Sequence, residues 1–201
     1  QYYYDDTPLK ELSSRWIGDL YPSPHDLRLG HRAIYNAMFA DTAKSKGAVR
    51  WGIKEVRLGI EHALYLHWLY PKARFLFIYR NPLDAFQSYS RYGRSWYKTW
   101  PGEPVFTPTA FGRHWQQLAE GFLKDAEKVG GLVIRYENLV ENSSTLQEIE
   151  HYLGIQIDRS VMVQKVGTSE RSGEKPWVSR LDKWLLRRAV TPLAKELGYE
   201  W

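Results

Sequence analysis

The sequence predicts an α/β fold in which a parallel β-sheet is flanked by helices. Short apolar strands alternate with amphipathic helices, and the runs Phe75–Tyr79 and Leu132–Tyr136 are apolar enough to be strands covered on both faces. The length of 201 residues suits one domain. We therefore expect a single domain over residues 1–201, with a helical part at 1–46 and the core and last helix in 47–201.

The first half of the chain is expected to contain three helices and two strands. Helical spacing of apolar residues predicts a helix over Leu9–Leu20, which Pro22 and Pro24 end. The apolar face of a second helix is expected at Leu27, Ile34, Ala37 and Met38, followed by a turn at Ser45–Gly47. The next three elements are a strand at Val49–Val56, a helix at Leu58–Tyr70 ended by Pro71, and the strand Phe75–Tyr79.

The second half begins with a helix directly after that strand, because Asn81 is a good N-cap and Pro82 suits the first helical position. This helix is expected to run to about Tyr92. The remaining elements follow in order: an irregular stretch at Gly93–Pro108, a helix through Phe111–Ala126, a Gly130–Gly131 turn, the strand Leu132–Tyr136, a helix at Ser144–Leu153 stopped by Gly154, an irregular stretch at Asp158–Pro176, and a last helix at Leu181–Leu197, bent at Pro192.

Composition excludes several classes of function. The chain has no Cys, which removes disulfides, thiolate nucleophiles and cysteine zinc sites, and no HExxH-type cluster occurs, so no metal is expected. The net charge is +5, but no run of five like charges occurs, which favours a small anionic ligand over nucleic acid. No apolar stretch approaches the ~18 residues of a membrane helix. Because residues 1–30 lack the features of a signal peptide, we expect a cytoplasmic location, or the Golgi lumen if an anchor precedes the chain.

The residues that follow the strand Phe75–Tyr79 are candidates for an anion site. Ligands of parallel sheets bind beyond the carboxyl ends of the strands, and a helix that starts there offers free N–H groups and a favourable dipole. Arg80 adds a planar guanidinium, and Ser88 adds a hydroxyl two turns along the helix. Alternatively, Arg80 pairs with Asp84 and Ser88 is a surface serine.

Four segments together resemble the sulfotransferases, which transfer a sulfuryl group from 3′-phosphoadenosine 5′-phosphosulfate (PAPS). Residues Ala73–Ser88 resemble the 3′-phosphate-binding segment, in which an Arg closes a strand, Asn/Asp-Pro opens a helix, and a Ser lies eight residues after the Arg. Val133–Leu139 is similar to the family's strand ending in R-Y-E-D/N-L. Trp51–Lys54 resembles its W-G-x-K, and Leu197–Tyr199 its C-terminal ending. The resemblance covers about residues 50–200.

The resemblance implies a P-loop NTPase-like sulfotransferase fold with PAPS as donor. It implies that Arg80 and Ser88 bind the 3′-phosphate and that Tyr136 contacts the adenine. Ser169, Arg171 and Gly173 lie where the family places further adenine and 3′-phosphate contacts, although this segment could equally be a solvated connector. The family's P-x-x-G-[ST]-[ST] loop, which cradles the 5′-phosphosulfate, does not occur in the chain. We expect it either upstream of Gln1 or absent, and the fold is then N-terminally incomplete here.

Lys54 and Glu55 are the catalytic candidates. By the resemblance, Lys54 corresponds to a lysine that contacts the bridging or sulfuryl oxygens. One subgroup of the family uses a His as the base, but the matching position in this chain is Val56, so Glu55 is the next candidate for the base. As the alternative, Glu55 pairs with Arg57 or Arg50.

The aromatic and basic residues of Gly93–Pro108 suit an acceptor with a sugar ring or an aromatic group, or they cap the core; the aromatic ones are Trp96, Tyr97, Trp100 and Phe106. The sequence thus predicts a sulfotransferase that acts on a hydroxyl or amine of a small molecule or glycan. The alternatives are a nucleotide-binding module of the same fold without turnover and a nucleoside or sugar kinase, for which the Walker lysine and magnesium carboxylate are not evident. The acceptor's identity and the oligomeric state are not predicted.

Overall fold

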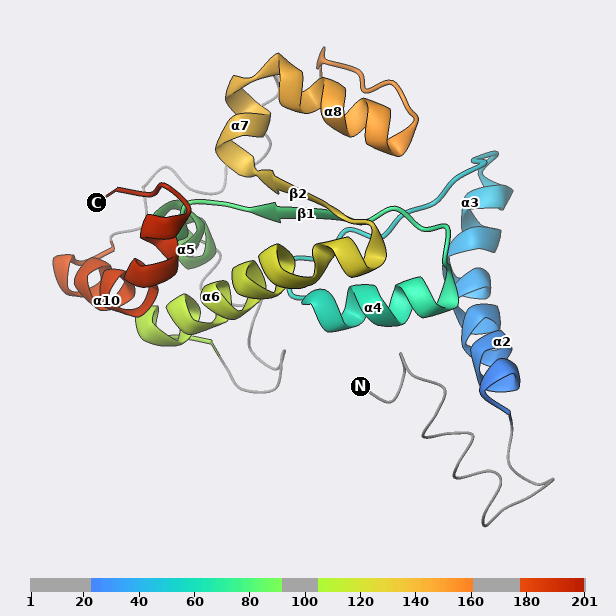
Figure 1. The fold of residues 1–201 in the computed structure, drawn as a ribbon, viewed down its shortest axis with the longest axis horizontal. Coiled ribbons are helices and arrows are strands. Elements are labelled where there is room, and N and C mark those ends of the chain that lie inside the picture. The colour runs from blue at the N-terminus through green and yellow to red at the C-terminus, as the bar shows by residue number, and fades with distance from the viewer. Residues whose placement is uncertain (1–22, 92–104, 161–177, 201) are drawn as a thin grey trace, which may run out of the picture. The chain divides into compact units, whose positions relative to one another are not determined.

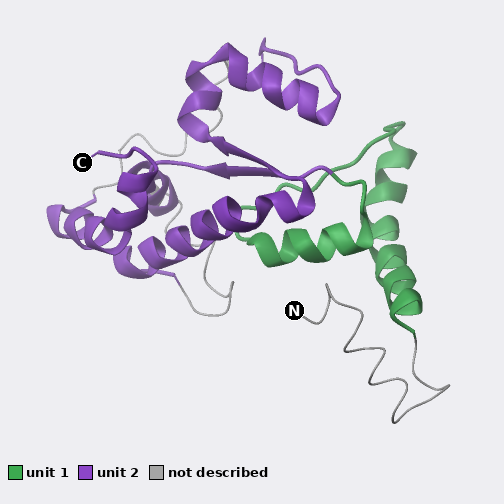
Figure 2. Cartoon of the chain, viewed as in Figure 1, with its two compact units in different colours: residues 1–73 green, residues 74–201 purple. Residues whose placement is uncertain are grey.

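The computed structural model describes residues 23–91, 105–160 and 178–200 (Figure 1). The chain divides into two compact units, residues 1–73 and 74–201 (Figure 2). The helix expected at Leu9–Leu20 lies outside the described residues, and the expectation of one domain over the whole chain stays a prediction. In the described ranges, no helix is both long and apolar enough to cross a membrane.

The regular elements in the described part of the first unit are all helices. Helix α2 (Pro24–Tyr35) continues into a π-helical turn, η3 (Asn36–Ala40), and into α3 (Asp41–Ser45), and α4 (Ile60–Leu69) follows. The sequence starts α2 at Pro24 because the Ser23 hydroxyl accepts the Asp26 backbone N–H and the Asp26 carboxylate accepts the Ser23 N–H.

Much of the apolar face expected for this helical segment is exposed. Ile34 of α2 is 58% and Met38 of η3 60% exposed, whereas Leu27 is partly buried. Instead, the Tyr65 hydroxyl of α4 lies 2.8 Å from His31 Nδ1, and the Tyr70 hydroxyl donates to Asn36 Oδ1 at 2.8 Å. The prediction was wrong because it weighed aliphatic residues alone. Aromatic and imidazole rings bury more area, and here their polar atoms find partners.

The strand expected at Val49–Val56 is absent; residues 49–56 form no regular element, and Val49 is 98% exposed. Trp51 is held by rings rather than by a β-ladder. It stacks on Phe39 with centroids 5.5 Å apart and meets Tyr70 edge-on, also at 5.5 Å. A strand-like segment forms a strand only where a neighbouring strand pairs with it. In the described residues the only paired strands are β1 and β2.

The second unit contains a two-stranded parallel sheet, which confirms the α/β class. Strands β1 (Leu76–Tyr79) and β2 (Leu132–Arg135) pair with Leu76 opposite Leu132 and Tyr79 opposite Arg135. The chain between and after them forms α5 (Pro82–Arg91), α6 (Pro108–Asp125), the 3₁₀ turn η4 (Ala126–Val129), α7 (Tyr136–Glu141), α8 (Ser143–Leu153) and α10 (Arg180–Glu196) (Figure 1).

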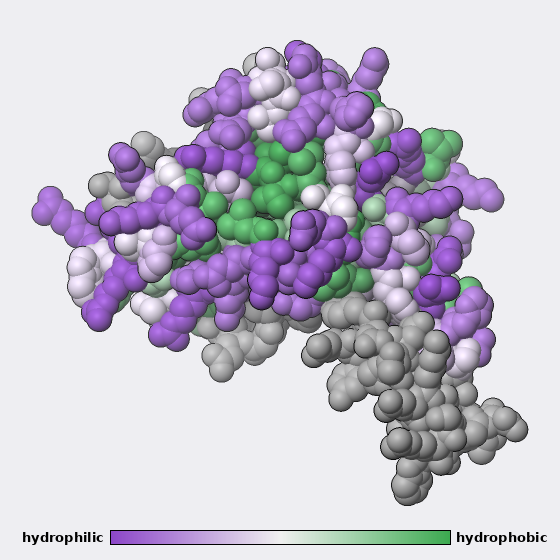
Figure 3. Space-filling view, in the orientation of Figure 1, coloured by the Kyte–Doolittle hydropathy of each residue, from purple (hydrophilic) through white to green (hydrophobic). Residues whose placement is uncertain are grey.

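Two expectations about the strands need correction. Ile78 is 42% exposed, so β1 is not covered on both faces by the described residues, and Figure 3 shows apolar side chains gathered at the centre of one face of the molecule. Tyr136 does not end β2 but begins α7, a short helix that was not predicted. Its six residues are too few to show a helical period in the sequence.

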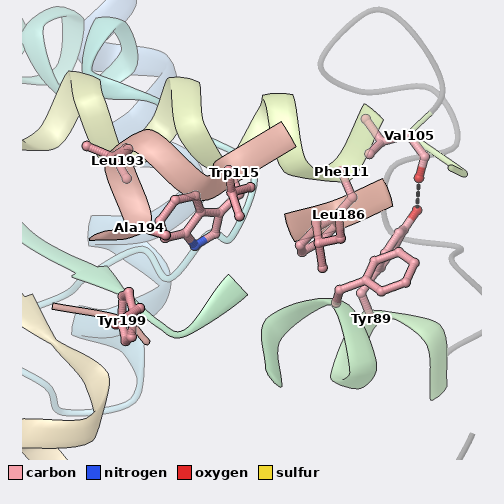
Figure 4. Packing of buried hydrophobic residues seen from close by; sticks show 11 residues of the cluster. Tyr89, Val105, Phe111, Trp115, Leu186, Leu193, Ala194 and Tyr199 are labelled. Atoms are coloured by element: carbon pink, nitrogen blue, oxygen red, sulfur yellow. Dashed lines mark hydrogen bonds between the residues drawn. The ribbon is translucent and has the colours of Figure 1, made fainter. Parts of the chain in front are cut away.

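The main core of this unit lies where α5, α6 and α10 meet (Figure 4). Phe86 and Tyr89 of α5, Phe111 of α6 and Leu186 of α10 are each 5% exposed or less. The Tyr89 hydroxyl donates to the Val105 carbonyl at 2.6 Å. These contacts fix α5 firmly, and α5 begins at the carboxyl end of β1.

Candidate functional site

The carboxyl ends of β1 and β2 bring together two residues of the predicted site. Because the strands are parallel and Tyr79 pairs with Arg135, the next residues, Arg80 and Tyr136, leave the sheet at the same edge. The Arg80 guanidinium carbon lies 4.6 Å from the centroid of the Tyr136 ring. This is a cation–π contact, and it joins the proposed phosphate-binding and adenine-binding residues into one feature.

The backbone of Arg80 is held in place by Trp115, and no carboxylate among the described residues forms an ion pair with its side chain. Its carbonyl accepts the Trp115 Nε1–H at 2.9 Å, which fixes the backbone at the end of β1. Its Nε is buried and has no hydrogen-bond partner in the part of the chain that the structure describes. The alternative pairing with Asp84 does not occur among the ion pairs of the described residues. A buried donor without a partner costs free energy, and an anion at this edge would satisfy it.

The start of α5 has the geometry expected for an N-terminus beside an anion. Asn81 Oδ1 accepts the Leu83 N–H at 2.9 Å, and Pro82 occupies the first helical position. Ser88 lies four residues after Asp84 and thus on the same side of α5, away from the buried Phe86. Ser88 is partly exposed.

Glu137 is the central polar residue of this edge, and the sequence reasoning did not identify it. Its Oε1 accepts the Asn81 N–H at 2.8 Å, and its Oε2 accepts the Tyr199 hydroxyl at 2.9 Å and Arg135 Nε–H at 3.2 Å. Burial raises the pKa of Glu137, but these hydrogen bonds outweigh burial and the pKa lies below its ordinary value. The carboxylate is therefore ionised at neutral pH.

Tyr199 and Arg135 complete this group. The Arg135 guanidinium carbon lies 4.3 Å from the centroid of the Tyr199 ring, and Tyr199 is 2% exposed. Burial and donation to Glu137 raise the pKa of Tyr199, so its hydroxyl keeps its proton. A glutamate directly after a buried strand was the available signal for Glu137. Its partners were not predictable, because Asn81 is 56 and Tyr199 62 residues away in the sequence.

The catalytic candidates Lys54 and Glu55 lie in the first unit. Lys54 is exposed. Glu55 forms a two-point ion pair with Arg57, in which Nε and Nη2 donate to its two oxygens at 2.8 Å each. This confirms the alternative pairing. The hydrogen bonds from Arg57 lower the pKa of Glu55 to about 2, which makes its carboxylate a weak base.

Several predicted residues lie outside the described residues, namely Ser169, Arg171, Gly173, Trp96, Tyr97 and Trp100. Phe106, from the same aromatic segment, is described and is 43% exposed. The adenine-side loop and most of the acceptor-side aromatics therefore stay predictions from the sequence.

Comparison with known proteins gives one finding. A family model described as "Sulfotransferase family" matches residues 6–159, which is more than half of the chain and includes both β1 and β2. No curated protein and no solved structure matches the chain.

Proposed function

The chain belongs to the sulfotransferase family, and on that basis we propose that it transfers a sulfuryl group from PAPS to a hydroxyl or amine of a small-molecule or glycan acceptor. The observation that carries the proposal is the stack of Arg80 on Tyr136 at the start of α5. We also propose that the two described strands belong to a P-loop NTPase-like sheet, as in the family that the sequence resembles.

The residues at this edge fit the 3′-phosphoadenosine part of the donor. Arg80 brings a charged guanidinium whose buried Nε lacks a partner, and α5 brings its N-terminal dipole. Ser88 adds a hydroxyl from the same helix. The Arg80 guanidinium stacks on the Tyr136 ring, yet Tyr136 remains 37% exposed, which leaves ring surface for an adenine. In this arrangement Arg80 and Ser88 bind the 3′-phosphate and Tyr136 contacts the base.

Lys54 and Glu55 are proposed for the transfer itself. When bound, PAPS would supply the sulfuryl group. The ammonium of Lys54 would stabilise charge on the transferred oxygens, since charge develops there during an in-line displacement. Glu55 would accept the proton of the acceptor hydroxyl. With a pKa of about 2 it takes that proton poorly while Arg57 holds it, so efficient base catalysis requires the ion pair to open.

The ion pair between Glu55 and Arg57 favours a second candidate, a nucleotide-binding module of this fold without turnover. A carboxylate held at a pKa of about 2 by a neighbouring arginine is typical of a structural ion pair. The two functions share the donor site and differ only in chemistry. Release of adenosine 3′,5′-bisphosphate from PAPS in the presence of acceptors supports the enzyme, whereas tight binding without release supports the module.

Binding of adenosine 3′,5′-bisphosphate tests the site that both candidates share. We expect the protein to bind this ligand more tightly than adenosine 5′-phosphate, measured by titration calorimetry. Arg80→Ala should weaken binding of the bisphosphate by ~1.5–3 kcal/mol, as expected for loss of a charge-assisted contact.

Arg74→Ala is the matched control for that variant. Arg74 also lies over a tyrosine ring, that of Tyr152 at 5.3 Å, but at the amino end of β1. The control removes the same charge and the same kind of contact away from the site, so it should leave the affinity unchanged. Equal affinities for the two nucleotides, or equal losses in the two variants, would contradict the proposed site.

A further inference from the structure

We propose that Glu137 is a positioning residue of this site and that it selects Arg80, rather than Arg135, as the arginine available to a 3′-phosphate. The inference rests on the proposed function, because it concerns how the same site chooses its ligand. Three features of the carboxyl edge support it: the way α5 is capped, the pairing of the two arginines, and the use of both Glu137 oxygens.

The first feature is a capping arrangement that reaches across the sheet. In a capping box, an acidic side chain three residues into the helix accepts the N–H of the N-cap residue. In α5 the N-cap is Asn81, and its N–H donates instead to Glu137, which follows β2. The Asn81 side chain meanwhile accepts the Leu83 N–H in the ordinary way. The carboxylate of Glu137, after β2, thus completes the N-terminal cap of α5.

This long-range cap sets the spacing of the two ligand-binding side chains. Asn81 directly follows Arg80, and Glu137 directly follows Tyr136. The hydrogen bond of 2.8 Å between the second residues of each pair therefore fixes the separation of the first residues, which are in cation–π contact at 4.6 Å. If this hydrogen bond breaks, the start of α5 can move relative to the end of β2, and the stack loses its geometry.

The second feature is the unequal treatment of two arginines at the same edge. Arg80 and Arg135 each lie over a tyrosine ring, at 4.6 Å and 4.3 Å. Arg135 donates to Glu137, whereas among the described residues Arg80 forms no ion pair and its buried Nε has no hydrogen-bond partner. Glu137 thereby neutralises Arg135, and the unpaired positive charge at this edge stays on Arg80, next to the N-terminus of α5.

The third feature is the full use of the carboxylate. Three donors, from Asn81, Arg135 and Tyr199, share its two oxygens. A carboxylate so close to an anion site would repel a phosphate if its charge were unopposed, and the paired guanidinium of Arg135 offsets it. The expected result is a site that accepts one phosphate at a defined position and discriminates against nucleotides that lack it.

The test measures nucleotide selectivity in Glu137→Gln. The amide keeps the shape of the side chain but loses its charge, so Arg135 becomes available to any phosphate and the link to Asn81 weakens. Both effects reduce selectivity. We expect the preference for adenosine 3′,5′-bisphosphate over adenosine 5′-phosphate to fall about tenfold, the factor that corresponds to one charge-assisted hydrogen bond.

Tyr152→Phe separates positioning from general loss of stability. The Tyr152 hydroxyl donates to the Gly130 carbonyl at 2.8 Å and accepts the Phe75 N–H at 2.9 Å, and thus joins the chain at the amino ends of the same two strands. Its removal destabilises the sheet at the end away from the site. The nucleotide preference should be unchanged in this variant even if its unfolding midpoint falls as far as that of Glu137→Gln.

Amide exchange of Asn81, followed by NMR without ligand, gives a second readout. Its exchange with D₂O should accelerate in Glu137→Gln and not in Tyr152→Phe. If Glu137→Gln does not fold, Tyr199→Phe replaces it, because it removes one of the three donors; a two- to threefold loss of preference is then expected.

The outcomes distinguish the inference from the function on which it rests. Failure of the unmodified protein to bind the bisphosphate overturns the proposed function and the selectivity role with it. Binding with an unchanged preference in the variant of Glu137 or Tyr199, or equal changes in Tyr152→Phe, overturns the inference alone. So does unaltered exchange of the Asn81 amide in Glu137→Gln.

Discussion

The ionisation of Glu55 is governed by one neighbour. The Arg57 guanidinium donates to both of its oxygens, and the Val56 and Arg57 backbone N–H groups add two further hydrogen bonds at 2.8 and 3.2 Å. The largest cause of the lowered pKa is the hydrogen bonding from Arg57. We expect Arg57→Gln to raise the pKa of Glu55 from about 2 toward its ordinary value, as measured by a carboxyl-carbon NMR titration.

The same titration bears on catalysis. If the pKa of Glu55 rises and turnover of PAPS rises with it, the arginine restrains a working base. A titration curve that does not move in Arg57→Gln would show that the ion pair is absent in solution. Glu55→Gln completes the set, and turnover equal to that of the unmodified protein would remove Glu55 from the mechanism.

Single site residues were predictable where the chemistry is local in sequence. Arg80 could be identified because it directly follows an apolar strand and the helix start at Pro82 supports it, whereas Tyr136 was identified through the family resemblance alone. Glu137 and Tyr199 act through partners far away in the chain. A sequence shows that such residues exist but not that they meet, because their contact is created by the register of β1 with β2 and by the packing of the C-terminal segment.

Among the elements, the contact of α6 with α10 is the one most sensitive to added volume. A Cβ at Gly112 would lie 2.8 Å from Ala189 Cβ and 3.1 Å from Val190 Cγ1, both in α10. Gly112→Ala should therefore destabilise the protein by about 1–3 kcal/mol, since the helices must separate, although the higher helix propensity of Ala offsets part of this loss. Urea unfolding followed by circular dichroism measures the change.

Gly30 supplies the matched control for this substitution. It lies within α2, and nothing stands within 4 Å of the position where its Cβ would be. Gly30→Ala should stabilise the helix by about 0.5–1 kcal/mol, because it gains propensity without a clash. If both variants raise the free energy of unfolding, then helix propensity, and not helix packing, decides the outcome at Gly112.

The ends of helices were predictable where a single residue in the sequence marks them. The Pro82 start of α5 was placed correctly, and α8 ends at Gly154 in the left-handed conformation with φ of 63°, as a glycine stop predicts. The prediction of a strand at Val49–Val56 was wrong because a strand needs a second segment to pair with, and one segment's sequence does not show whether that partner exists. The prediction of the buried face of α2 was wrong because α4 packs against it with aromatic rings and a hydroxyl group, which a pattern of aliphatic residues does not reveal.

For the whole molecule, the net charge of +5 and the local charge at the site have different effects. The overall charge favours anionic ligands at long range, and added salt screens it. It does not choose among nucleotides. At the carboxyl edge of the sheet, Arg135 forms an ion pair with Glu137, whereas Arg80 has no ion-pair partner among residues 23–91, 105–160 and 178–200. Selectivity is therefore expected to survive moderate salt better than affinity does.

The stability of the whole molecule should fall as the pH is lowered through the range of histidine. His114 of α6 is 7% exposed, and burial lowers its pKa below 6.5. The unfolded chain binds a proton there at a higher pH than the folded protein does. The contribution of His114 is thus fully present above pH 6.5 and is lost as the pH falls toward the folded pKa, by at most about 1.4 kcal/mol per pH unit.

His114→Gln isolates this contribution, because a neutral amide of similar size cannot take up the proton. Urea unfolding at pH 7, 6 and 5 should show a smaller decline for the variant than for the unmodified protein. The pKa of Glu55 and that of Glu137 are lowered, so these carboxyl groups act on stability below about pH 4.5 and leave this window clear. Parallel declines in the two proteins would mean that His114 is protonated in the folded state, which its exposure of only 7% argues against.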